Sequence, residues 1–160
     1  NTVVVRTSEK TNFEISKKKI IKTSGCANGT IFDDIIEEIK EINITPSLYL
    51  KSGAIHGCVL CSKNKTLAFF EDVGRHNAID KLAGYMFLNN IKPQDKILYT
   101  TGRLTSEMVI KTIMMKIPVL ASRSGYTAWG VDLAKESGLT MLGRLRGRTF
   151  TVLSGNHRIK

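Results

Sequence analysis

The chain has 160 residues, 42% of them hydrophobic, and a formal net charge of +10. This length and apolar content predict one globular domain with its own core, and no segment reaches the roughly 18 consecutive apolar residues of a membrane span. The positive charge predicts attraction to phosphates, nucleic acid or an acidic partner without choosing among them. Three cysteines without a signal-peptide pattern predict free thiols in a cytoplasmic protein rather than a disulfide framework.

Residues 1–22 are predicted as a strand-rich segment. The chain begins without Met and at once as an extended β-branched run, so we expect this segment to be the end of a longer N-terminal region. Residues 23–160 are then the α/β domain. A helix is predicted from Thr30, a residue able to cap it, because isoleucines recur at helical spacing over the next twelve positions.

Cys26 lies directly before that helix, in the glycine-flanked loop Ser24–Gly29. A helix N-terminus and nearby lysines lower the pKa of a thiol, and the resulting thiolate is a nucleophile. Cys26 is therefore the candidate reactive thiol, with an incidental loop cysteine as the alternative.

The rest of the chain alternates strands and helices. A hairpin is expected from two extended runs, and the last strand is expected at an edge. The hairpin covers residues 54–62 and 66–70, the helices 77–89, 105–116 and 127–137, and the strands 96–101, 117–122, 139–145 and 149–152. Regular alternation implies right-handed crossovers, so the prediction is a three-layer α/β sandwich with a mixed, mostly parallel sheet.

Cys58 and Cys61 have the C-x-x-C spacing of a redox pair or of half a zinc site. Both fall inside a predicted strand, where residues three apart point to opposite faces of the sheet. We therefore predict two buried structural cysteines and no zinc.

Three polar strings, at residues 70–80, 100–107 and 121–127, follow predicted strands at the edge where ligands bind in open α/β sheets. We expect them to form one crevice whose arginines and helix N-termini suit phosphate groups; three ordinary capped loops are the alternative. The candidate binding residues are Asp72, Arg75, His76, Asp80, Gly102, Arg103, Glu107, Arg123 and Ser124.

A fourth string, rich in arginine and glycine, follows the strand at 139–145 and is interpreted either as a phosphate-gripping turn or as a solvated basic hairpin. Its candidate residues are Arg144, Leu145, Arg146, Gly147, Arg148 and Thr149. The chain contains neither G-x-G-x-x-G nor a Walker-type loop, which argues against a conventional Rossmann or P-loop protein.

Four strings, EDVGRHNAIDKLAG, TTGRLTSEMVIK, IPVLASRSGYT and LAKESGLTMLGRLRGR, resemble the formate dehydrogenase accessory sulfur-carrier family, FdhD. The resemblance runs from about Thr23 to Val152. It implies a cytidine-deaminase-like fold, with His76 and the loop at 102–106 where a deaminase holds zinc. The family's C-G-x-C-G loop falls at Ser24–Gly29, where this chain keeps only Cys26, and its Phe-x-Arg-Gly-Gly-Arg motif falls at 144–149.

The resemblance also implies a function. Such a protein takes persulfide sulfur from a cysteine desulfurase, here on Cys26, and passes it to the bis-guanine-dinucleotide molybdenum cofactor for formate dehydrogenase. This is sulfurtransferase-like chemistry, and GDP is expected to mimic the cofactor in the crevice. Carboxylates such as Asp72 or Asp80 would select guanine, because they can accept from both N1–H and N2–H. A homodimer is left open.

Three alternatives stand beside the sulfur carrier. A non-catalytic chaperone would hold the molybdenum cofactor without transferring sulfur. A nucleobase deaminase is disfavoured by missing zinc ligands. Generic nucleic-acid binding lacks interleaved aromatic residues or a groove-reading motif, and we expect neither nucleic acid nor a membrane as partner.

Overall fold

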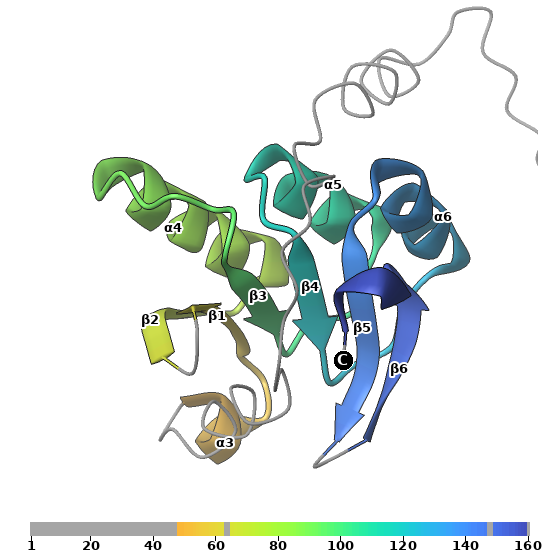
Figure 1. Ribbon diagram of the computed structural model, residues 1–160. Helices are drawn as coiled ribbons and strands as arrows, with labels where there is room; N and C mark the ends of the chain where they lie inside the picture. The colour runs from red at the N-terminus through yellow and green to blue at the C-terminus, as the bar shows by residue number, and fades with distance from the viewer. Residues whose placement is uncertain (1–47, 63–64, 147–148, 160) are drawn as a thin grey trace, which may run out of the picture.

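The computed structural model describes residues 48–62, 65–146 and 149–159 (Figure 1). These residues form one sheet, four α-helices and a short 3₁₀-helix, η2, at Asn156–Arg158. The helices are α3 (Leu48–Ser52), α4 (Arg75–Leu88), α5 (Ser106–Met114) and α6 (Ala128–Ser137). The strands are β1 (His56–Ser62), β2 (Lys65–Asp72), β3 (Ile97–Thr100), β4 (Val119–Ser122), β5 (Thr140–Arg146) and β6 (Thr149–Ser154).

The predicted elements after residue 54 are confirmed to within two residues at each end. The last long helix shows why: Thr127 caps α6 by accepting a hydrogen bond from the main-chain N–H of Gly130, and Gly138 ends it with a left-handed φ of 71°. The helix α3 has no counterpart among the predicted elements, since five residues carry too short a pattern. The predicted strands of residues 1–22, the boundary at residue 23 and the helix from Thr30 lie outside the described residues.

The sheet has the strand order β2-β1-β3-β4-β5-β6. The pairs β3–β4 and β4–β5 are parallel, as crossover helices require. The pairs β1–β2, β1–β3 and β5–β6 are antiparallel. A mixed α/β sheet is therefore confirmed, but its parallel part is smaller than predicted. The connections β1 to β2 and β5 to β6 are too short for a crossover, and β3 pairs with β1, the strand of the hairpin that runs against it.

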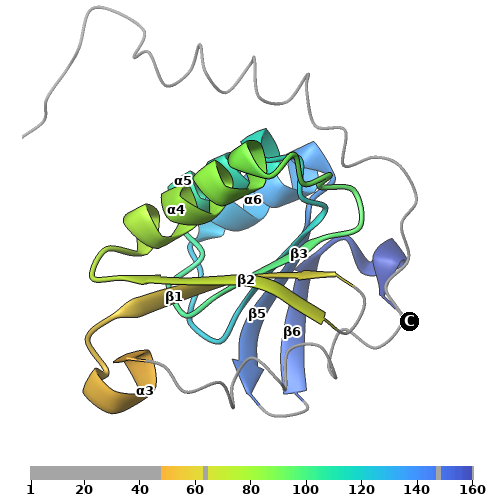
Figure 2. The same ribbon diagram turned by 90° about the vertical axis from the view of Figure 1, so that its left-hand side faces the viewer.

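The helices α4, α5 and α6 cover one face of the sheet (Figure 2). Side chains of β1 alternate between two hydrophobic clusters, so that Cys58 and Leu60 pack on the helix side, while Val59 and Cys61 pack with Tyr99 on the opposite face. The described residues account for two of the three predicted layers, a helical layer and the sheet. No helix within these ranges is long and apolar enough to cross a membrane.

Candidate functional site

One edge of the sheet gathers nearly all predicted site residues. The parallel strands β3 and β4 end there, and the helices that follow them begin there. The antiparallel register of β1 places His56 opposite Asp72 and Cys58 opposite Thr100, so β1 begins and β2 ends at the same edge. The expected placement of the polar strings at the carboxyl ends of the strands is thus confirmed, whereas one crevice shared by all three stays a prediction.

Hydrogen bonds tie two of these strings together. Ser122 donates from Oγ to the main-chain oxygen of Gly102 at 2.6 Å. Leu104 donates its N–H to the carbonyl of Gly125 at 2.9 Å, and its own carbonyl accepts from Thr127 at 3.1 Å. The β3–α5 and β4–α6 loops therefore form one unit, held by a short parallel bridge rather than by side-chain packing alone.

A cavity of about 610 Å³ opens beside this unit. Its lining residues are Thr101, Arg123, Ser124, Gly125, Arg144 and Arg146. Four of them are predicted site residues: Arg123, Ser124, Arg144 and Arg146. The other two, Thr101 and Gly125, lie within the polar strings but were not among the candidate binding residues. Three guanidinium groups with hydroxyl and main-chain donors, and no carboxylate, form a donor set that suits phosphate oxygens.

Arg144 reaches the rim of this cavity through an unusual backbone. Its φ of 55° is left-handed, and its N–H donates to the carbonyl of Ser124 at 3.3 Å. Its guanidinium lies 5.6 Å from the centre of the Tyr126 ring, within the range of a cation–π contact. Gly143 allows this approach, because a Cβ there would lie 2.9 Å from both Tyr126 and Leu153 carbons.

The remaining residues of the fourth string are placed differently. The side chain of Leu145 is buried in the core cluster of Tyr99, which leaves only its main chain for a ligand. Thr149 donates from its hydroxyl to the carbonyl of Arg146 at 2.9 Å and so closes the turn. Gly147 and Arg148 lie outside the described residues.

Asp72 organises the turn into α4. Its carboxylate accepts from the Gly74 N–H at 2.9 Å and the Asn77 side chain at 3.0 Å, and lies 2.7 Å from the Lys81 ammonium. These interactions, the Lys81 hydrogen bond first, lower the pKa of Asp72 to about 2. Asp80 binds Lys111 with both oxygens at 2.8 Å. Both predicted guanine acceptors therefore have partners in the protein, and base selection by them stays a prediction.

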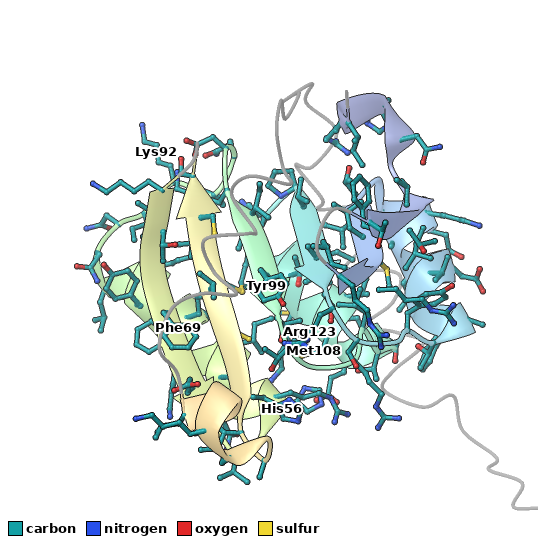
Figure 3. All side chains as sticks on the ribbon, turned by 90° about the horizontal axis from the view of Figure 1, so that it is seen from below. His56, Phe69, Lys92, Tyr99, Met108 and Arg123 are labelled. Carbon is teal, nitrogen blue, oxygen red and sulfur yellow. The ribbon has the colours of Figure 1, made fainter. Side chains whose placement is uncertain are left out.

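Two histidines lie at the edge. His76 Nε2 is 3.3 Å from the carboxylate of Glu107, which joins the starts of α4 and α5. His56, at the start of β1, is a residue that sequence reasoning missed, and Figure 3 shows it at the same edge as Arg123. Burial first, then the charges of Arg75 and Arg103, lower the pKa of His56. Its position directly before an apolar run was the available signal.

The two strand cysteines behave as predicted. Cys58 and Cys61 are buried on opposite faces of β1. Burial raises the pKa of Cys58 to about 11, and its Sγ lies 3.4 Å from Thr100 Oγ1. Cys26 lies outside the described residues. Within the described ranges, no three His, Cys, Asp or Glu side chains are grouped as metal ligands, and the absence of zinc stays a prediction.

Residues 2–160 match the model of the FdhD/NarQ family. The chain belongs to this family. It is 35% identical over 127 residues to the sulfur carrier protein FdhD of Geobacillus kaustophilus, an overlap of 79% of this chain and 48% of the relative. It is 37% identical over 134 residues to the sulfur carrier protein FdhD of Nocardia farcinica, with 82% and 48% covered.

The fold has a solved counterpart. A crystal structure of a protein described as a formate dehydrogenase accessory protein, from Desulfotalea psychrophila, is similar with a TM-score of 0.79 and 32% identity. The similarity covers 89% of this chain and 62% of that one. This FdhD/NarQ chain spans about half the length of the curated relatives it matches.

Proposed function

We propose that this chain is a sulfur carrier, which takes sulfur from a cysteine desulfurase as a persulfide on Cys26 and passes it to a molybdenum cofactor for formate dehydrogenase. The observation that carries the proposal is the cavity of Arg123, Arg144 and Arg146, which offers three positive groups to an anionic ligand in a chain of the FdhD/NarQ family. The names of the relatives supply the sulfur-carrier role.

The loading step needs no external oxidant or reductant. The Cys26 thiolate attacks the terminal sulfur of a desulfurase persulfide, a new S–S bond forms, and the desulfurase cysteine leaves as a thiolate. In the delivery step the acceptor attacks the same terminal sulfur and provides the electron pair for its new bond, while Cys26 leaves as a thiolate. Because Cys58 and Cys61 are buried, Cys26 is the thiol assigned to this chemistry.

The acceptor is the bis(molybdopterin guanine dinucleotide) form of the cofactor, bound as cargo. Its phosphates suit the cavity, because each guanidinium can donate two parallel hydrogen bonds to phosphate oxygens. GDP carries the same guanine and diphosphate and is the natural probe of this site. We place the activity in the cytoplasm, with formate dehydrogenase and a cysteine desulfurase as protein partners, and leave dimerisation to measurement.

Mass spectrometry after incubation with a cysteine desulfurase and cysteine tests the loading step. We expect a gain of one sulfur atom on the Cys26 peptide, and no gain in Cys26→Ser. Cys58→Ala is the matched control, since it removes a buried thiol and should load fully. Label that stays in Cys26→Ser would exclude Cys26 as the carrier.

A second outcome would favour the non-catalytic cofactor chaperone. That alternative has one observation in its favour. Two of the three cysteines, Cys58 and Cys61, are buried on opposite faces of β1 and therefore cannot pair with each other. If GDP binds but no persulfide forms on any cysteine, the chain holds the cofactor without carrying sulfur. Calorimetry with GDP and ADP on the same samples measures the binding that both functions require, and the persulfide measurement separates them.

A further inference from the structure

Three buried side-chain nitrogens at the carboxyl edge have no hydrogen-bond partner among the described residues. They are His56 Nδ1, Arg75 Nε and His76 Nδ1. Proteins rarely leave such atoms unpaired, because an atom that is removed from water without a new partner loses the hydrogen bonds it made there. Three in one neighbourhood indicate that a polar ligand belongs there.

The side chains that carry these atoms are neighbours. Arg75 packs on Gly102 so closely that a Cβ on that glycine would lie 3.0 Å from Arg75 Cβ and 3.2 Å from its Cδ. The charges of Arg75, Arg103 and His76 all act on His56. The strand β1, the start of α4 and the β3–α5 loop therefore present nitrogen-bearing side chains to one place.

The unpaired Arg75 atom defines the ligand as an acceptor. Arginine has only donors, so the partner of Arg75 Nε must supply an oxygen with a free lone pair. His76 Nε2 lies 3.3 Å from Glu107, and when it donates its proton there the unpaired Nδ1 of the neutral ring is an acceptor, which a protonated oxygen of the same ligand, such as a phosphate OH, fills. Either ring nitrogen of His56 can donate to such an oxygen.

Nearby carboxylates do not supply that oxygen. Asp72 is bound to Lys81, and Asp80 is bound to Lys111. Glu107 is 61% exposed and faces His76. Within the described ranges neither Arg75 nor Arg103 forms an ion pair, and the Glu107 carboxylate beside His76 offsets only part of their positive charge. An oxyanion fits this charge better than a neutral acceptor does.

This neighbourhood is separate from the arginine cavity. None of His56, Arg75 and Arg103 lines that cavity. Thr101 joins the two places: it lines the cavity, and its Oγ1 accepts from the N–H of Gly57, the residue after His56, at 2.9 Å. The two sites are thus side by side at one edge, on either side of Thr101.

We propose that His56, Arg75, Arg103 and His76 form a second oxyanion subsite, which binds one tetrahedral oxyanion while the arginine cavity holds the phosphates of a nucleotide. The ligand of the whole edge is then a molecule, or a pair of molecules, with two separate anionic groups. Binding of an oxyanion at the second subsite does not depend on sulfur loading on Cys26. Only the expectation that a nucleotide fills the arginine cavity at the same time rests on the proposed function.

Calorimetry with inorganic phosphate on the whole chain, with and without saturating GDP, tests the subsite. We expect two phosphates per chain without GDP and one with GDP. Arg75→Lys keeps the charge and most of the stem but removes the Nε donor. It should weaken the phosphate that persists with GDP by about tenfold or more, the usual effect of losing a hydrogen bond to a charged group.

Two variants of His56 supply a control that does not depend on the folding of the arginine variant. The amide of Asn sits near the position of Nδ1 and that of Gln near Nε2, so His56→Gln should weaken phosphate about tenfold and His56→Asn much less. Arg146→Ala, in the cavity, should weaken GDP and leave the persistent phosphate unchanged. Circular dichroism confirms that each variant is folded.

The possible results separate the two proposals. Complete displacement of phosphate by GDP, or equal affinity in folded Arg75→Lys and His56→Gln, would overturn the second subsite. If GDP does not bind but one phosphate still depends on Arg75 and His56, the subsite stands and the nucleotide part of the proposed function fails. If free phosphate does not bind at all, the subsite proposal is wrong. The donors of the subsite would bind an oxyanion whether it is free or part of a larger ligand.

Discussion

Ser122 donates from Oγ to the main-chain oxygen of Gly102 at 2.6 Å, and this buried bond joins the ends of the parallel strands β4 and β3. Ser122 also accepts from the N–H of Ser124 at 3.0 Å. One hydroxyl thus positions both loops of the arginine cavity. The same kind of bond occurs far from the site, where Ser154 donates to the carbonyl of Leu139, also at 2.6 Å.

Ser122→Ala is expected to affect both stability and ligand binding. Loss of the hydroxyl leaves the buried Gly102 carbonyl without this donor, which costs about 1–3 kcal/mol of unfolding free energy. It also frees Ser124 and so should weaken GDP binding. Urea denaturation and calorimetry measure the two effects. Ser154→Ala should lose similar stability with unchanged GDP affinity; a matching loss of affinity there would show that stability alone governs binding.

The buried thiol of Cys58 should make stability depend on alkaline pH. Its pKa rises from 9.0 to about 11 on folding, so the unfolded thiol ionises first. The stabilisation is complete below pH 9 and is lost as the pH rises toward 11. Urea denaturation at pH 8, 9, 10 and 11 should show a steeper fall for the wild type than for Cys58→Ala, which itself costs about 1–3 kcal/mol at pH 7. Parallel curves would contradict a buried, protonated Cys58.

Asp72 should give the opposite pH dependence. Its pKa falls from 3.8 to about 2 on folding, chiefly through the Lys81 hydrogen bond. The stabilisation is therefore present above pH 4 and is lost as the pH falls toward 2. Asp72→Asn keeps an oxygen for the Gly74 N–H but removes the charge. We expect it to be less stable than the wild type at pH 7, with a difference that shrinks by pH 3. Denaturation curves at both values provide the comparison.

The order of elements was accessible from the sequence because local signals agree with one another. Thr127 and Gly138 mark the ends of α6, and period-2 alternation places Cys58 and Cys61 on opposite faces. Strand direction was less accessible, because it depends on which strands become neighbours. The antiparallel pairing of β1 with β3 joins residues about forty apart, as Cys58 opposite Thr100 shows, and no local pattern encodes it.

The site was predicted in its location more fully than in its details. Arg123, Arg144 and Arg146 were found because polar residues that follow strands converge at one edge. The bond of Asp80 with Lys111 joins two helices and depends on their packing, so the sequence could not show that this carboxylate has a partner. His56 was missed because the search covered only residues that follow strands. His56 is the first residue of β1, which reaches the same edge because it runs antiparallel to β3.

Arg144 tests the link between backbone strain and ligand binding. Its φ of 55° is costly for a residue with a Cβ but not for glycine. Arg144→Ala and Arg144→Gly both lose the guanidinium and its contact with Tyr126, so both should weaken GDP binding, by about 1.5–3 kcal/mol if the group donates to phosphate. The two variants should differ in stability, because only glycine relieves the strain.

We expect Arg144→Gly to be more stable than Arg144→Ala by about 0.5–1 kcal/mol, the usual advantage of glycine in a left-handed position after its greater freedom in the unfolded chain is included. Thermal and urea denaturation measure this difference, and calorimetry with GDP measures the shared loss of affinity. Gly138, which has φ 71° but lies at the C-terminal end of α6, is the control: Gly138→Ala should lose stability with GDP affinity intact. Equal stability of the two Arg144 variants would mean that the strand relaxes around this residue. Unchanged GDP affinity in both would remove Arg144 from the site, because neither variant retains a charged donor at the cavity rim.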